Sequence, residues 1–159
     1  MFLYAFWVIF TLLALLGVFL GWKICVTDLR RRIIPDAYLF PLLIDGLIIT
    51  TFFPWVCSIS EGVIGMLFGY ILAATVGFFF DRSMNKHNPN AVAPIGMGDI
   101  KLIATGGLWL GVQGLALALV GACIFGAIWS YAKKQKYIPF APFFIAGAFL
   151  ALIVVGFLI

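Results

Sequence analysis

The chain of 159 residues is 65% hydrophobic and only 10% charged, with a mean hydropathy of +1.19. Soluble domains are about half apolar and about a quarter charged, so the composition excludes an ordinary soluble fold, and it is also too apolar for a disordered chain. A membrane-spanning helix needs roughly 20 mostly apolar residues. The sequence therefore predicts an all-α, polytopic membrane protein in which residues 1–159 form one membrane-embedded domain with about six spans.

The predicted spans follow one another with short connections. The first, residues 1–22, carries no charge, and its basic residues follow it rather than precede it, which predicts an anchor and not a signal peptide. The third has glycines at Gly62, Gly65 and Gly69, a spacing that lets helices approach closely in lipid. Gly111 is expected to separate the fourth span from the fifth. The six predicted spans cover residues 1–22, 38–53, 62–80, 100–110, 112–131 and 141–159.

The basic residues predict the orientation of the chain. All ten Lys and Arg residues fall in three segments, 23–36, 81–101 and 132–140. Lysine and arginine favour the cytoplasmic side of a membrane, so this pattern predicts an N-terminus outside and these three segments inside. The net charge of +4 is then explained by attraction to anionic lipid, without nucleic acid. Within this pattern, residues 81–98 are predicted to be a loop.

Two of the six acids lie where predicted spans meet the inner face. Asp28 precedes three arginines and Pro35, and the alternative for it is pairing with those arginines at the interface. Asp99 follows Gly96 and Gly98 where a loop enters a short helix, and the alternative for it is capping that helix. Capping does not explain the glycines, which allow another chain to approach the backbone closely, as a protease requires of its substrate.

The predicted topology places Asp28 and Asp99 at similar depth, 71 positions apart in the sequence (99 − 28). Two neighbouring carboxyl groups can share one proton, because like charges a few ångström apart resist ionising together. The ionised member can then take a proton from water while the protonated member polarises a peptide carbonyl. Such a pair titrates as a unit, and it needs no metal and no cofactor.

The remaining titratable residues are assigned other roles. Asp45 lies inside the second span, roughly 10 Å deeper than a boundary residue, and is the rival functional acid. Asp36 and Glu61 are expected to cap the second and third helices, and Asp81 to lie in the inner loop. The three cysteines are isolated, and the sequence places no cysteine pair or acidic cluster near His87. The sequence therefore gives no support for a metal site or a redox site.

Three stretches resemble the type IV prepilin peptidases, membrane aspartic proteases with a Gly-x-Gly-Asp motif. The segment from Asp28 to Pro35 resembles the one around the first catalytic aspartate, residues 96–102 (Gly-Met-Gly-Asp-Ile-Lys-Leu) resemble the signature around the second, and residues 138–143 (Ile-Pro-Phe-Ala-Pro-Phe) resemble a Pro-Phe-Gly-Pro turn before the last helix. The resemblance implies Asp28 and Asp99 as the catalytic pair. It also implies Gly96, Gly98 and Lys101 as residues beside the bound substrate.

The same resemblance implies the activity: removal of basic leader peptides, after a glycine, from type IV prepilin or pseudopilin substrates at the cytoplasmic face of the cell inner membrane. The chain departs from the family pattern at Asp36, which is often Asn, and at Ala141, which is usually Gly. It also lacks the two CxxC pairs of many members, which predicts a peptidase without the N-methyltransferase activity. The alternative from another class is a small proton-coupled carrier that uses Asp45. The sequence predicts no oligomeric state.

Overall fold

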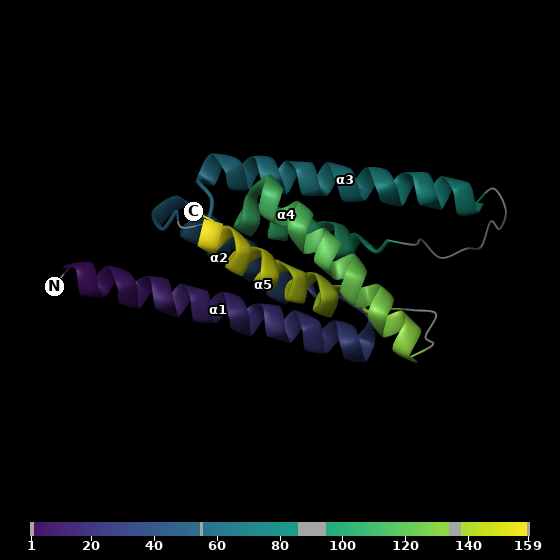
Figure 1. Ribbon diagram of the computed structural model, residues 1–159, viewed down its shortest axis with the longest axis horizontal. Coiled ribbons are helices and arrows are strands. Elements are labelled where there is room, and N and C mark those ends of the chain that lie inside the picture. Colours follow the sequence, from purple (N-terminus) through teal and green to yellow (C-terminus); the bar gives the residue numbers. More distant parts are fainter. Residues whose placement is uncertain (1, 55, 86–94, 134–137, 159) are drawn as a thin grey trace.

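The computed structural model describes residues 2–54, 56–85, 95–133 and 138–158. These residues form helices and no strand, so the predicted all-α class is confirmed for the described part of the chain (Figure 1). The helices are α1 (Phe2–Arg31), α2 (Asp36–Phe52), α3 (Ile59–Asn85), α4 (Met97–Lys133) and α5 (Phe140–Leu158).

Three helices are long and apolar enough to cross a membrane by length and composition: Tyr4–Arg31, Ile59–Met84 and Met97–Lys133. A shorter apolar helix covers Phe140–Gly156. A helix forms its backbone hydrogen bonds within itself, as a lipid environment requires. These helices therefore indicate an integral membrane protein. The number of six spans and the outward N-terminus stay predictions.

Helix α1 is longer than the apolar run that predicted it. It continues from Trp22 to Arg31, so Asp28 lies in its last turn and not in a connecting segment. The residues after Trp22 contain no helix breaker, and polarity alone does not end a helix. The helix ends where Arg32 adopts a left-handed conformation, with φ of 54°, and donates its N–H to the Asp28 carbonyl at 2.8 Å. Pro35 then keeps the connection to α2 extended.

The prediction of a loop over residues 81–98 is wrong at both ends. Helix α3 includes Asp81 and continues to Asn85, and α4 already begins at Met97. Residues 81–85 at the end of α3 are mostly polar, but none of them is a proline or glycine that would break the helix. Helix α3 therefore extends beyond its apolar part. The middle of the predicted loop, with His87, lies outside the described residues.

Helices α3 and α4 pack closely along the predicted glycine row. A methyl group built on Gly62 would lie 2.6 Å from the Leu108 carbonyl oxygen, and one on Gly65 would lie 2.8 Å from the Gly111 carbonyl carbon. Gly65 and Gly107 face each other across the contact, each leaving no room for a Cβ on the other. The prediction that this row allows close helix packing is confirmed, and the partner is α4.

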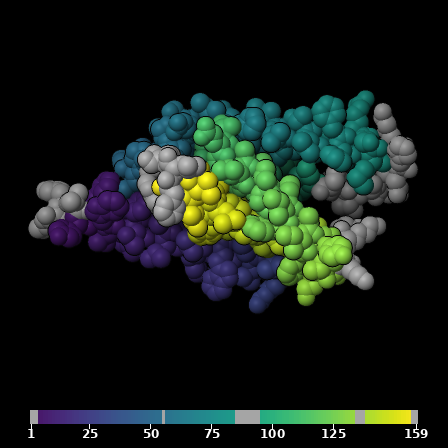
Figure 2. All heavy atoms as spheres, viewed as in Figure 1, coloured from purple at the N-terminus to yellow at the C-terminus, as the bar shows by residue number. Residues whose placement is uncertain are grey.

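The predicted break at Gly111 is also present. Gly111 has φ of 66° and ψ of −176°, which divides α4 into a first arm, Met97–Leu110, and a second arm that continues to Lys133. Such a φ is open to glycine and strained for other residues. The second arm packs against α5, where Gly147 fits against the Ala118 carbonyl. In the space-filling view α5 lies between α1 and α4 (Figure 2).

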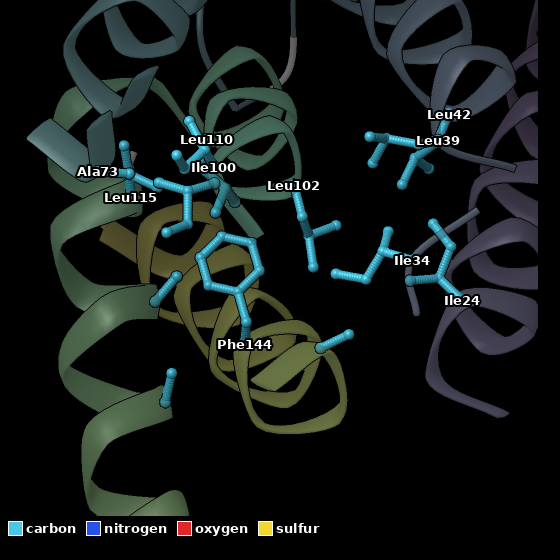
Figure 3. Packing of buried hydrophobic residues seen from close by; sticks show 14 of the residues in the cluster. Ile24, Ile34, Leu39, Leu42, Ala73, Ile100, Leu102, Leu110, Leu115 and Phe144 are labelled. Carbon is cyan, nitrogen blue, oxygen red and sulfur yellow. The ribbon is translucent and has the colours of Figure 1, made fainter. Parts of the chain in front are cut away.

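The core lies where α1, α2, α4 and α5 meet. Ile24, Leu39, Leu102 and Phe144 are buried and come one from each of these helices (Figure 3). The Phe144 ring occupies the space above Gly106, where a methyl group would lie 2.5 Å from the ring. Ile24 and Leu102 lie one helical turn from Asp28 and Asp99, so this core supports the end of the bundle that carries the two acids.

Candidate active site

Four helix ends meet at one end of the bundle. The last turn of α1 carries Asp28, and the first turns of α2, α4 and α5 carry Asp36, Asp99 and Ala141. Hydrogen bonds join α1 to α5 and α4 to α2 at this end, and the Asp99 carboxyl group is close enough to Asp28 to be affected by its charge. The structure therefore brings the two predicted acids together from positions 71 residues apart.

Asp28 is buried, with 5% of its surface exposed, and is held by the start of α5. Its Oδ2 accepts a hydrogen bond from the Ala141 N–H at 2.9 Å. Backbone N–H groups in the first turn of a helix have no partner inside the helix, and they carry the positive end of its dipole. Pro139 and Pro142 flank this amide and have no N–H of their own. The start of α5 thus points a backbone donor, the Ala141 N–H, at the carboxylate.

Asp99 is half-buried in the first turn of α4, where Gly96 precedes the helix. Its Oδ2 accepts the Gly96 N–H at 3.3 Å, an arrangement in which the third residue of a helix reaches back to the residue before its start. The alternative that Asp99 caps its own helix is therefore correct for one oxygen. Capping and catalysis are compatible, because the contact with Gly96 uses only one of the two oxygens and keeps the carboxyl group at the end of the bundle that carries Asp28.

The two glycines of the motif occupy different surroundings. A methyl group on Gly98 would lie 2.9 Å from Ile34 Cβ, so glycine lets the first turn of α4 press against the segment between α1 and α2. A methyl group on Gly96 would lie 3.4 Å from Asp99 Oδ2, which is ordinary contact, and Gly96 is exposed. Gly98 has a packing role, and contact of either glycine with substrate stays a prediction.

Lys101 forms an ion pair that sequence reasoning missed. Its Nζ lies 2.8 Å from both carboxylate oxygens of Asp36, which joins the first turn of α4 to the first turn of α2. The expectation that Asp36 caps α2 is wrong, because Pro35 occupies the cap position and no side chain hydrogen-bonds the helix start. No local signal in the sequence links two residues 65 positions apart. The predicted role of Lys101 in substrate binding stays a prediction.

Removing this ion pair should weaken the contact between α2 and α4 only slightly. Both side chains are partly exposed, and such pairs contribute about 0.2–1 kcal/mol. We expect a double-mutant cycle with Asp36→Ala and Lys101→Ala, measured by unfolding in detergent, to give a coupling energy in that range. In a control cycle, Lys133→Ala at the far end of α4 takes the place of Lys101→Ala, and its effect on stability should simply add to that of Asp36→Ala. Additive effects for Asp36 and Lys101 would contradict the ion pair.

The other acids lie apart from this site. Asp45 is buried in α2, nine residues after Asp36 and so roughly 13 Å further along the helix axis. Among the described residues, neither of its oxygens has a hydrogen-bond partner. Glu61 accepts the Ser58 N–H at 2.8 Å while its own N–H points to Ser58 Oγ at 3.4 Å, which confirms the expected cap of α3.

Comparison with known proteins identifies the family. Residues 14–131, most of the chain and including both Asp28 and Asp99, match the model of the type IV leader peptidase family. The chain belongs to the type IV leader peptidase family. The resemblance inferred from the three motifs is thereby confirmed, and membership of the family favours the peptidase over the carrier.

Relatives named "Prepilin leader peptidase/N-methyltransferase" align with most of the chain. The protein from Aeromonas salmonicida is 30% identical over 150 residues, which are 90% of this chain and 49% of the relative. For Xanthomonas campestris pv. campestris the identity is 33% over 129 residues, 76% of this chain and 42% of the relative. The protein from Pseudomonas aeruginosa is 30% identical over 133 residues, which are 79% of this chain and 43% of the relative. This member of the leader peptidase family thus spans about half the length of these relatives. No solved structure matches it.

Proposed function

We propose that the protein is a membrane aspartic endopeptidase that removes the basic leader peptide from type IV prepilin or pseudopilin precursors. Cleavage follows a glycine and takes place at the cytoplasmic face of the cell inner membrane, within a single membrane-embedded catalytic domain. The observation that carries this proposal is the meeting of Asp28 and Asp99 at one end of the bundle, together with the family match.

In the proposed reaction the two carboxyl groups share one proton. The ionised group takes a proton from a water molecule whose oxygen attacks the carbonyl carbon of the scissile peptide, while the protonated group donates to the carbonyl oxygen. The resulting tetrahedral intermediate collapses with cleavage of the C–N bond, and the leaving amine takes up a proton from the pair. The Ala141 amide and the Gly96 amide keep the two carboxyl groups in position during these transfers.

The proposed cytoplasmic location rests on the charge pattern. The end of α1 that carries Asp28 also carries Arg30 and Arg31, and the start of α4 that carries Asp99 also carries Lys101. Basic residues favour the cytoplasmic side, so both acids would lie on that side of the membrane. A substrate anchored in the same membrane would present its peptide bond at this level.

The proposal is tested with the purified chain in liposomes and a prepilin precursor inserted in the same membrane. We expect two products, identified by mass spectrometry, whose new ends correspond to cleavage after a glycine that precedes the apolar segment. The reaction should proceed after exhaustive treatment with a metal chelator, because the proposed chemistry uses only the carboxyl pair. No cleavage by the wild-type chain, or cleavage elsewhere in the precursor, would contradict the proposed function.

A further inference from the structure

The core that supports the two aspartates also closes one end of a large cavity. Leu102 and Phe144 belong to this core (Figure 3), and they line the cavity on the side away from Asp28 and Asp99. The cavity has a volume of about 660 Å³ and lies between α1, α2, the first arm of α4 and α5. Protein cavities that bind ligands have about this volume. None of the steps of the proposed reaction uses it.

The described side chains that line this cavity offer no free polar hydrogen to a ligand. Four of them carry one: Thr50, Cys57, Thr105 and Trp109. Each already donates it to a backbone carbonyl of the protein, at 2.9 Å from both threonine hydroxyls, 3.1 Å from the Trp109 ring nitrogen and 3.6 Å from the Cys57 sulfur. A ligand with polar groups would lose their hydrogen bonds on entering, which is unfavourable. The lining therefore favours a hydrocarbon.

The cavity opens between α1 and α5. Val18 on α1 and Phe149 and Ile153 on α5 line it, and between 44% and 53% of the surface of each is exposed. On the adjoining side the rings of Phe10 and Phe53, with centroids 5.4 Å apart, join α1 to α2. In an integral membrane protein the exposed apolar surfaces of α1 and α5 face lipid, so the opening is continuous with the lipid-facing surface.

The length of the cavity matches that of one acyl chain. Its lining follows α5 from Phe144 to Gly156, twelve residues and so roughly 18 Å along the helix. The hydrocarbon core of a bilayer is about 30 Å thick, so the acyl chains of each leaflet extend over about 15 Å. At the end opposite the two aspartates the lining includes Val56 and Cys57, which follow the end of α2. One acyl chain can therefore lie along α5 through the full length of the cavity.

The substrate of the proposed reaction is a weaker candidate for the same space. Its apolar segment would have to follow the scissile bond, and a packed core separates the two aspartates from the cavity. This part of the core consists of Ile24, Leu39, Leu102 and Phe144. A polypeptide would also bring backbone N–H and C=O groups into a lining whose side chains have no donor to spare. A lipid chain needs no hydrogen bond and already lies at the opening.

We propose that the cavity binds one acyl chain of a membrane phospholipid, which enters between α1 and α5 and ends against Leu102 and Phe144. The site is separate from the carboxyl pair, and its occupancy does not depend on the proposed peptidase function. The bound chain packs against both α1 and α5, the two helices that the hydrogen bond from the Ala141 amide to Asp28 joins at the other end. Lipid thereby stabilises the arrangement of the helices that carry and hold Asp28.

The first test uses a phosphatidylethanolamine with a photoreactive diazirine on one acyl chain, in liposomes that contain the full chain. We expect crosslinks, mapped by mass spectrometry, to Thr105 and Leu110 on α4, which line the cavity and are 1% and 3% exposed. A phospholipid on the outer surface cannot reach these two residues without entering the cavity. Labelling of exposed residues on α1 and α5 without any labelling of Thr105 and Leu110 would overturn the inference.

A matched pair of variants on α5 controls this result. Ala148 lines the cavity and is half-buried, whereas Ala146 is exposed and lies outside the described lining. Ala148→Phe fills part of the cavity and should lower the labelling of the two α4 residues at least about fivefold, while Ala146→Phe should leave it unchanged. Ala14→Phe fills the cavity from α1 and should act like Ala148→Phe, which guards against a folding defect in one variant. Equal labelling in the wild-type chain and all three variants would overturn the inference.

Competition by other occupants is the second measurement. Unlabelled prepilin precursor, or a higher density of the chain in the liposome, should leave the labelling of Thr105 and Leu110 unchanged. Loss of labelling on addition of precursor would assign the cavity to the substrate, and loss at higher density would assign it to a second copy of the chain. Either result would overturn the inference, and neither depends on whether the precursor is cleaved.

Discussion

Replacing either Asp28 or Asp99 by asparagine is expected to lower leader cleavage by at least about 10³-fold. General acid–base catalysis by one group contributes about 10²–10⁴-fold, and the pair acts as a unit, so losing either member removes most of the rate. Asparagine still offers an oxygen to the Ala141 and Gly96 amides, so each helix end keeps its hydrogen bond. The measurement is the rate of precursor cleavage in liposomes at equal enzyme concentration.

The control for this pair is Asp81→Asn. Asp81 lies near the end of α3, and none of the proposed steps uses its carboxylate. Its variant should cleave the precursor at the wild-type rate, and all three variants should show the same helix content by circular dichroism. Cleavage near the wild-type rate by either Asp28→Asn or Asp99→Asn would contradict the two-aspartate assignment.

Replacing Gly65 by alanine is expected to destabilise the bundle strongly. The new methyl group would meet the Gly107 carbonyl oxygen and the backbone of Gly111 on α4, and neither can move without shifting the helix. Overpacking of this kind costs about 1–3 kcal/mol, and contact with backbone rather than side chain places this case at the upper end. The measurement is the free energy of unfolding in mixed detergent, together with the yield of folded protein.

Gly77→Ala is the matched control, because it changes a glycine on the same helix. A methyl group there would meet Ile95 Cβ at 3.7 Å, which is ordinary contact. Since alanine favours a helix over glycine by up to about 1 kcal/mol, this variant should be neutral or slightly more stable than the wild-type chain. Equal stability of the Gly65 and Gly77 variants would show that the two helices are not packed as closely as described.

Residues with a strong local or motif signal could be predicted from the sequence. The spacing of Gly62 and Gly65 indicated a helix contact, and Glu61 was expected to cap α3, because both patterns act over a few residues. Gly111 indicated a break since its conformational freedom is local. Two short motifs indicated Asp28 and Asp99, and the charge pattern predicted that both lie at the inner face.

Contacts between distant segments could not be predicted in the same way. The pairing of Asp36 with Lys101 depends on how the first turns of α2 and α4 are oriented, and that orientation results from packing of the whole bundle. The hydrogen bond from the Ala141 amide to Asp28 comes from backbone, which carries no residue-specific signal. Polarity was also a poor guide to the ends of α1 and α3, because a helix can continue past the apolar part that crosses a membrane.

The close contact between α3 and α4 also limits which changes in chain length the protein can tolerate. Gly107 is held against Gly65, and Asp99 lies eight residues earlier on the same helical arm. Each residue of an α-helix turns the chain by about 100°, so a single insertion or deletion between them would rotate the carboxyl group away from Asp28. The length of this arm therefore sets where Asp99 lies relative to the contact between α3 and α4.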